Sequence, residues 1–204
     1  MARGVGAERV LGVVLAGGQG RRCGGRDKAW LRLRGRPLLC HAVERLCAQV
    51  EQVVVSANRH RWACRRLGLA SIPDPAQWAG RGPLAAIAAA WMHYPGRTLA
   101  IVPVDCPLAP VNHVAKLRAV LAGGVPVAAL RCGGRVQPLF ALIAPVLEED
   151  AIAALQSPRP PPMWQWLEAA GVSWLDWPDP DGWTFANINR LDDLRDLEAA
   201  CARA

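Results

Sequence analysis

The sequence predicts an α/β fold in three layers, with a mostly parallel β-sheet between helices. Short apolar runs alternate with stretches in which apolar residues recur at helical spacing. Glycine or polar residues follow directly after several of these runs, as expected where the strand ends carry a ligand site. At 204 residues, the chain is interpreted as a single domain over residues 1–204.

The first apolar run, residues 10–16, predicts a buried strand that ends at Gly17 and Gly18. The residues that follow, up to Arg26, are rich in glycine and arginine. Glycine lets the backbone turn so that successive N–H groups surround an anion, and arginine donates paired hydrogen bonds to phosphate oxygens. The segment therefore predicts a phosphate-binding loop.

Two familiar phosphate-binding loops do not fit this segment. A Walker A loop has Ser or Thr directly after its lysine, but Lys28 is followed by Ala29. A dinucleotide-binding loop has the spacing G-x-G-x-x-G, and Cys23 stands where the third glycine belongs. Both types of loop are excluded by spacing alone.

The rest of the first half continues the alternation of strands and helices. Its expected elements are a helix over 37–50, a strand over 53–55, a short helix and a strand near 69–72, a helix over 84–93 and a strand over 98–102. Ser56, Asp74 and Asp105 follow the three strands. Because the carboxyl ends of parallel strands share one edge of a sheet, we expect these residues near Gly17.

The second half is less regular. It predicts helices over 111–121, 145–155, 163–170 and 191–202, and strands over 125–130, 136–143, 172–177 and 184–185. Gly133 and Gly134 indicate a tight connection between the first two of these strands, such as a hairpin. Asn187 and Asn189 alternate along an extended segment, which places both amides on one face.

Charge is unevenly distributed along the chain. Residues 1–66 contain 14 Lys or Arg and 4 Asp or Glu, whereas the remainder contains 10 and 13. Small polyphosphate ligands explain this asymmetry, because no basic stripe with interleaved aromatic residues and no helix-turn-helix pattern supports nucleic-acid binding. Nothing approaches the run of about 18 apolar residues that a membrane helix needs. Neither nucleic acid nor a membrane is an expected partner.

Cysteine and lysine usage give two further indications. The seven cysteines include no C-x-x-C pair, which favours reduced thiols in a cytoplasmic protein over disulfides or zinc. The chain contains 22 arginines but only two lysines, Lys28 and Lys116. A lysine in the phosphate loop of such a chain indicates a site that needs a compact point charge.

The loop and its surroundings resemble a known family. The segment LAGGQGRRCGGRDK is similar to the nucleotidyltransferase pattern L-A-G-G-x-x-x-R-[MC]-G-G-x-D-K. With the residues up to Leu46, it resembles the molybdenum cofactor guanylyltransferases, the MobA family. Cys23 stands for the usual Met, and Gly20 stands where Ser or Ala is commoner. The resemblance extends over residues 10–194 and implies the nucleotide-diphospho-sugar transferase-like variant of the Rossmann fold.

The resemblance also implies a reaction. Members of this family transfer GMP from Mg²⁺-GTP to the terminal phosphate of molybdopterin, releasing pyrophosphate and forming the guanine dinucleotide cofactor. We accordingly expect a nucleotide-binding half over about 8–110 and an acceptor-binding half over about 111–204. Transient contacts with other proteins of molybdenum cofactor biosynthesis, or with acceptor molybdoenzymes, are further expectations.

The family motifs assign roles residue by residue. The expected nucleotide-binding residues are Leu15, Ala16, Gly17, Gly18, Lys28, Ser56, Asp74, Gly82 and Asp105. The expected catalytic residues are Arg22, Lys28 and Asp105, with Asp105 as the Mg²⁺ ligand, because a carboxylate at the end of a buried strand suits a hard cation held together with phosphate oxygens. The expected acceptor-binding residues are Gln137, Asn187 and Asn189.

Alternative interpretations stay open for several of these residues. Asp105 is a candidate cap for the helix expected from residue 111, Asn189 for the helix expected from 191, and Asp74 is a candidate turn residue. Ser56 replaces the asparagine of the family motif N-A-N-R, and its hydroxyl reaches less far. The rival functions are cytidylyl transfer to molybdopterin, nucleotidyl transfer to a sugar or alcohol phosphate, and GTP binding without catalysis.

Overall fold

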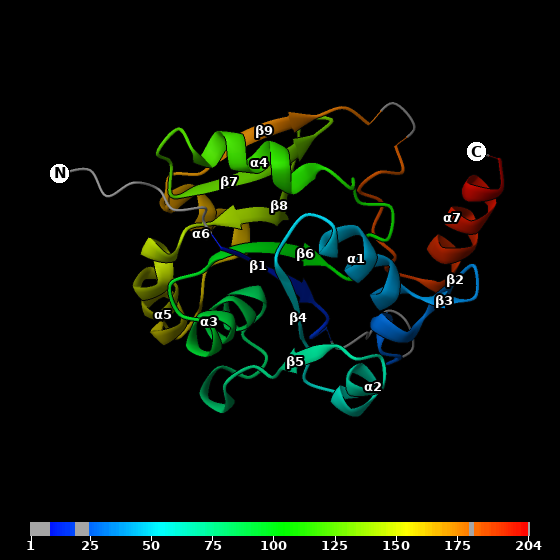
Figure 1. Ribbon diagram of the computed structural model, residues 1–204, viewed down its shortest axis with the longest axis horizontal. Coiled ribbons are helices and arrows are strands. Elements are labelled where there is room, and N and C mark those ends of the chain that lie inside the picture. The colour runs from blue at the N-terminus through cyan, green and yellow to red at the C-terminus, as the bar shows by residue number, and fades with distance from the viewer. Residues whose placement is uncertain (1–8, 19–24, 180–181, 204) are drawn as a thin grey trace.

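A seven-stranded sheet forms the centre of the computed structural model, which describes residues 9–18, 25–179 and 182–203 (Figure 1). The strands in spatial order are β5 (Ala70–Ile72), β4 (Gln52–Ser56), β1 (Val10–Leu15), β6 (Thr98–Pro103), β8 (Arg135–Ile143), β7 (Val127–Cys132) and β9 (Ser173–Trp177). All neighbouring strands are parallel except β8, which runs antiparallel to β6 and to β7. The expected mostly parallel sheet is confirmed.

Helices cover both faces of this sheet. The helices are α1 (Leu38–Cys47), α2 (Arg61–Arg66), α3 (Pro83–His93), α4 (His113–Leu121), α5 (Glu148–Gln156), α6 (Met163–Ala169) and α7 (Leu191–Arg203), with 3-10 turns η2 (Lys28–Trp30), η3 (Ala76–Trp78) and η4 (Pro145–Leu147). The packing divides into two clusters, one holding buried residues of α1 and α4 and the other those of α3, α5 and α6. The expected three layers are therefore present.

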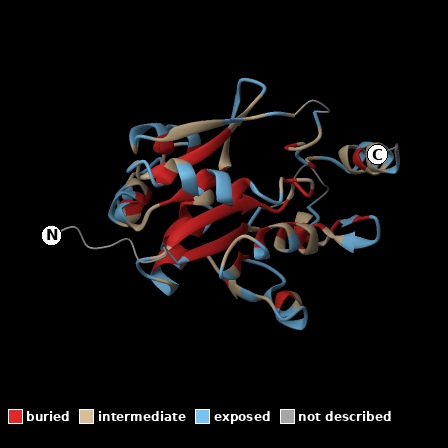
Figure 2. Cartoon of the chain, turned by 45° about the horizontal axis from the view of Figure 1, so that its top comes forward, coloured by how far each residue is buried: buried red, intermediate tan, exposed pale blue. Residues whose placement is uncertain are grey.

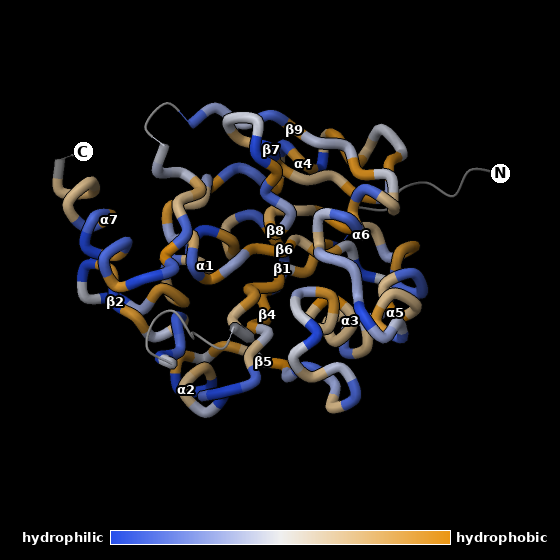
Figure 3. Tube along the Cα trace, turned by 180° about the vertical axis from the view of Figure 1, so that it is seen from behind, coloured by the Kyte–Doolittle hydropathy of each residue, from blue (hydrophilic) through white to orange (hydrophobic). Residues whose placement is uncertain are grey.

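Strand β1 shows why the sheet is buried on both sides. Val10 and Val14 belong to the cluster beneath α1 and α4, whereas Leu11 and Val13 belong to the cluster beneath α3. Side chains alternate between the faces of a strand, so a continuous apolar run satisfies both layers at once. Buried residues concentrate in the central strands (Figure 2), which also form the most hydrophobic part of the chain trace (Figure 3).

The hairpin expected at Gly133 and Gly134 is present, because these two residues connect β7 to the antiparallel β8. The prediction of a strand at residues 184–185 is wrong. Thr184 and Phe185 form a turn, in which the Thr184 backbone N–H and hydroxyl both donate to the Asp179 carboxylate, at 3.2 and 2.7 Å. Local side-chain hydrogen bonds thus replace strand pairing there.

Helix α7 lies beside a small second sheet formed by β2 (Arg32–Leu33) and β3 (Arg36–Pro37), away from the main sheet (Figure 1). The Arg34 backbone N–H donates to the Glu198 carboxylate at 3.0 Å, and the Arg34 guanidinium donates to the Cys201 carbonyl. These contacts bring helix α7 next to the segment that follows the phosphate loop. Within the described ranges, no helix is long and apolar enough to cross a membrane.

Candidate active site

The site lies along the edge formed by the carboxyl ends of four adjacent parallel strands. Gly17 follows β1, Ser56 ends β4, Asp74 follows β5 and Asp105 follows β6. This is the arrangement expected from the sequence, because polar residues after parallel strands converge at one edge. Leu15 is the last residue of β1, and Ala16 follows it, with its backbone N–H donating to the Ser56 carbonyl at 2.9 Å. Gly17 and Gly18 are exposed.

Lys28 joins three distant parts of the chain. Its Nζ donates to Asp105 Oδ2 at 2.7 Å and to Asn189 Oδ1 at 2.9 Å. The Lys28 and Asp105 side chains are only 18% and 21% exposed, so water screens this ion pair less than it screens a surface pair. A cation from the phosphate loop, a carboxylate from the end of β6 and an amide from the C-terminal segment therefore form one cluster.

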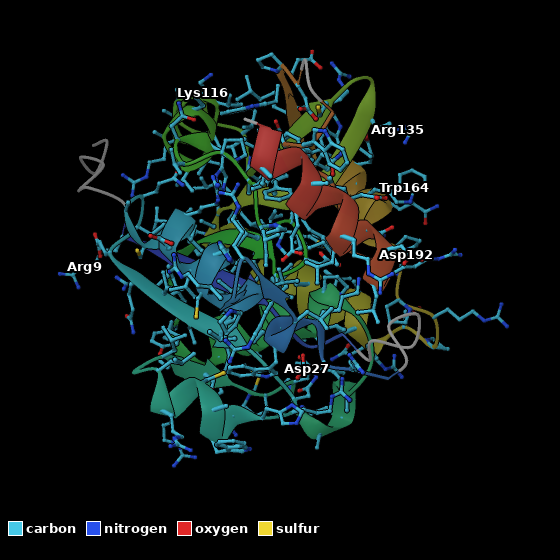
Figure 4. The ribbon with its side chains drawn as sticks, turned by 90° about the vertical axis from the view of Figure 1, so that its right-hand side faces the viewer. Arg9, Asp27, Lys116, Arg135, Trp164 and Asp192 are labelled. Atoms are coloured by element: carbon cyan, nitrogen blue, oxygen red, sulfur yellow. The ribbon has the colours of Figure 1, made fainter. Side chains whose placement is uncertain are left out.

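Asp27 fixes the position of Lys28. One oxygen of its carboxylate accepts the Ala29 backbone N–H at 3.1 Å and caps the 3-10 turn η2. The other oxygen lies 2.9 Å from His60 Nδ1, and the Asp27 side chain is only 7% exposed. Figure 4 shows Asp27 below α7 on this side of the molecule. The aspartate of the G-G-x-D-K motif thus orients the lysine that follows it.

Hydrogen bonds join the C-terminal segment to the residues that follow β6 and to Lys28. The Ile188 backbone N–H donates to the Asp105 carbonyl at 2.9 Å. The Cys106 thiol donates to Asn187 Oδ1 at 2.7 Å, and burial raises the pKa of this thiol well above its usual value, which keeps it protonated. Asn189 contacts Lys28 and is part of the Lys28 cluster. The Asn187 side chain contacts Cys106 instead, and its acceptor role stays a prediction.

Neither helix-cap alternative matches the geometry. The cap position of α4 is Asn112, and the Asp105 carboxylate binds Lys28 instead. At α7, the Asp193 carboxylate accepts the backbone N–H groups of Asn189 and Arg190, at 2.7 and 2.8 Å. Both residues that the sequence left open between capping and ligand binding therefore point their side-chain oxygens at Lys28.

The loop after β4 holds both flanks of the phosphate loop. The Arg59 guanidinium donates to the Gly18 carbonyl at 3.3 Å and to the Gly25 carbonyl at 3.5 Å. His60, in the left-handed conformation with φ of 51°, contacts Asp27. Arg22, the third expected catalytic residue, lies outside the described residues.

Asn58 and Asp74 form a second polar pair at this edge. Asn58 Nδ2 donates to Asp74 Oδ2 at 2.7 Å, and the Asp74 backbone N–H donates to Asn58 Oδ1 at 2.8 Å. Partial burial raises the pKa of Asp74, and the hydrogen bond from Asn58 opposes that rise. Ser56 is only 1% exposed, and its hydroxyl has no hydrogen-bond partner among the described residues. Its role in nucleotide binding stays a prediction.

Sequence reasoning did not assign a role to Asn58, Arg59 or His60. The available signal was their position directly after β4, within the stretch S-A-N-R that resembles a family motif. The motif pointed to its first position, Ser56, which is the buried last residue of β4. The third position, Asn58, lies beyond the end of the strand and is exposed.

Gly82 and Gln137 are two further residues that the sequence assigned to the site. Gly82 is the exposed cap residue of α3, with φ of 77°, a conformation that glycine adopts without strain. Gln137 lies near the start of β8, and because β8 is antiparallel to β6 its first residues lie toward the carboxyl end of β6. The described residues show no hydrogen bond between Gln137 and the Lys28 cluster. Its acceptor role stays a prediction.

The donor set fits a divalent cation of the magnesium type. Such ions prefer oxygen ligands and are commonly held by one or two carboxylates together with substrate phosphates. Asp105 offers a carboxylate at the loop, and its Oδ1 makes no hydrogen bond to any described residue. The described ranges contain no group of three or more His, Cys, Asp or Glu that would hold a metal by themselves. The residues present fit an ion held by one carboxylate together with phosphates, and the role of Asp105 as its ligand stays a prediction.

Comparison with known proteins identifies the family. Residues 12–169 match the family described as the MobA-like NTP transferase domain. The chain belongs to this family. It is 38% identical to a molybdenum cofactor guanylyltransferase from Shewanella pealeana over 153 residues, which cover 74% of the chain and 76% of the relative. It is 36% identical to one from Cereibacter sphaeroides over 194 residues, covering 94% and 96%.

Solved structures agree with the MobA-like fold. Molybdopterin-guanine dinucleotide biosynthesis protein A from Archaeoglobus fulgidus superimposes with a TM-score of 0.78 at 23% identity, covering 95% of the chain and 100% of that protein. A Mycobacterium tuberculosis protein, Rv0371c, solved in complex with manganese, gives a TM-score of 0.70 at 15% identity, covering 94% and 99%. The expected nucleotidyltransferase fold and enzyme class are confirmed.

Proposed function

We propose that the chain transfers GMP from Mg²⁺-GTP to the terminal phosphate of molybdopterin. An acceptor phosphate oxygen attacks the α-phosphorus of GTP, the bond to the β-phosphate oxygen breaks, and pyrophosphate leaves. The observation that carries the proposal is the contact of Lys28 with both Asp105 and Asn189. It joins the phosphate loop to a candidate metal ligand and to the candidate acceptor segment. The names of the curated relatives support the same reaction.

Transfer of this kind needs charge neutralisation and alignment more than covalent participation by the protein. The exposed backbone of Gly17 and Gly18 would cradle phosphate oxygens, and Lys28 would neutralise their charge. Asp105 would hold the Mg²⁺, which supplies further charge neutralisation on the phosphates when bound. Asn187, Asn189 and Gln137 would orient the acceptor. No activated nucleophile on the protein is required, because the acceptor phosphate itself attacks.

The choice of base tests the proposal against its nearest rival. We expect product formation from molybdopterin with GTP and little with CTP or ATP, as the G-G-x-D-K segment and the curated relatives suggest. Initial rates with each nucleotide at equal Mg²⁺ concentration measure the preference. Equal or faster turnover with CTP would assign the protein to the cytidylyl transferases. Tight GTP binding without turnover would indicate a regulatory GTP-binding protein.

The acceptor role of the C-terminal segment gives a second prediction. Asn189→Ala removes the amide oxygen that accepts from Lys28 but leaves the loop and Asp105 in place. We expect product formation to fall about tenfold, while GTP affinity measured by calorimetry stays near normal. A large loss of GTP affinity at unchanged melting temperature would instead place Asn189 against the nucleotide.

The proposed setting is the cytoplasm. The substrates are small molecules, and the product passes to molybdoenzymes through transient protein contacts. Copurification with such partners from cells that produce molybdopterin tests this part of the proposal independently of the catalytic assays.

A further inference from the structure

Asn58 is exposed, yet its side chain is held by specific hydrogen bonds. It follows β4, and its amide makes two hydrogen bonds to one residue, Asp74, which follows the neighbouring strand β5. One bond, at 2.7 Å, goes to the carboxylate, and the other, at 2.8 Å, comes from the backbone N–H. Together they fix the orientation of the Asp74 side chain relative to its own backbone.

The same amide lies close to the phosphate loop. A methyl group built on Gly17 would lie 3.2 Å from Asn58 Nδ2, a distance tighter than most packed contacts. The absence of a side chain at Gly17 therefore leaves room for the Asn58 amide. Asn58 lies between the glycine loop and Asp74, and it is hydrogen-bonded to Asp74.

Charge decides which part of a nucleotide Asp74 can face. An ionised carboxylate repels phosphate oxygens and accepts hydrogen bonds only from donors. The phosphates belong on the exposed glycine backbone, so the carboxylate suits the hydroxyl or N–H donors of the nucleoside. Asp74 Oδ2 is engaged by Asn58, and Oδ1 makes no hydrogen bond to the described residues. Oδ1 is thus available to such a donor.

We propose that Asn58 is a positioning residue that holds Asp74 beside the glycine loop, so that Asp74 accepts a hydrogen bond from the nucleoside of the bound nucleotide. The inference rests on the proposed function, because it requires a nucleotide in the loop. It also assigns the polar role at the end of β4 to Asn58 rather than to Ser56, whose side chain is buried. Asn58 acts through Asp74 and makes no contact of its own with the ligand.

A double-mutant cycle tests this dependence. GTP affinity is measured by calorimetry for the wild type, Asn58→Ala, Asp74→Ala and the double variant, with the melting temperature of each. We expect Asn58→Ala to weaken GTP binding about tenfold and to raise KM more than it lowers kcat. The double variant should bind no more weakly than Asp74→Ala, because Asn58 has nothing to position once Asp74 is absent. Additive losses would overturn the inference.

Two further variants sharpen the result. Asn58→Asp keeps the shape, so the fold survives, but replaces the donor to Asp74 by a second carboxylate oxygen. It should therefore bind GTP more weakly than Asn58→Ala. Asn112→Ala removes an exposed asparagine at the cap of α4 that makes no side-chain cap bond, and it should leave GTP affinity unchanged.

A phosphate-only probe separates the nucleoside from the loop. Asn58→Ala should bind magnesium tripolyphosphate as tightly as the wild type does, because Asp74 contacts only the nucleoside. An equal loss of affinity for tripolyphosphate and GTP would show that Asn58 supports the phosphate loop instead, and would overturn the inference. Failure of the wild type to bind GTP would contradict the proposed function itself. Wild-type GTP affinity in Asn58→Ala would contradict only the role of Asn58.

Discussion

Replacing Asp105 by asparagine is expected to slow GMP transfer by roughly a hundredfold or more, equivalent to about 3–4 kcal/mol of transition-state stabilisation. The change keeps the shape of the side chain but removes the negative charge proposed to hold Mg²⁺. The fold should survive, because the carboxylate is not used as a helix cap and the Asp105 carbonyl still accepts from Ile188. Rates measured as a function of Mg²⁺ concentration should show that the variant needs more Mg²⁺ than the wild type to reach half of its maximal rate.

The matched control for Asp105 is Asp176→Asn. Asp176 is an exposed carboxylate on β9, paired with Arg131 at 2.7 Å, and the arginine holds the pKa of Asp176 below its usual value. Its loss should not alter the Mg²⁺ dependence. A wild-type rate for Asp105→Asn at limiting Mg²⁺ would show that Asp105 is not the metal ligand.

The second large effect is expected for Lys28→Met, which keeps the length of the side chain and removes its charge. We expect the rate of transfer to fall about a hundredfold, since one positive charge is lost where negative charge must be neutralised on the phosphates. The melting temperature should fall by about 2–4 °C, because Asp105 loses a partly buried partner worth about 1 kcal/mol.

Two lysine variants provide controls for Lys28→Met. Lys28→Arg keeps the charge, but the planar guanidinium cannot place one nitrogen between Asp105 Oδ2 and Asn189 Oδ1, so only part of the rate should return. Lys116→Met removes the other lysine, which lies 4.3 Å from the ring centre of Trp177 and far from Asp27 in Figure 4, and it should leave the rate unchanged. A wild-type rate in Lys28→Met would limit Lys28 to a role in the fold.

The sequence predicted the elements that depend on local pattern. Residues 10–16 gave a buried strand because a continuous apolar run satisfies both faces of a parallel sheet. Gly133 and Gly134 gave the β7–β8 connection because glycine accommodates the positive φ values of 55° and 74° found there. The segment at 184–185 failed because its hydrogen bonds go to the Asp179 side chain, which no strand pattern indicates.

The sequence predicted those parts of the candidate site that lie on consecutive residues of a motif. The prediction was incomplete where the site depends on contacts between residues far apart in the chain. The loop at Gly17 and Lys28 was evident from composition and spacing. Asn58 was missed because neither its position close to Gly17 nor its hydrogen bonds with Asp74 are visible in the sequence.

The sequence by itself determined which functional groups follow which strands. A glycine loop follows the first strand, and carboxylates follow later strands of one parallel sheet. Only the tertiary structure decided which of these groups meet. Lys28 reaches Asp105 across 77 residues and Asn189 across 161 residues, through the binding of the C-terminal segment to the end of β6. Such contacts depend on how the layers pack and on which face of a strand each side chain lies, and local residue patterns do not specify either.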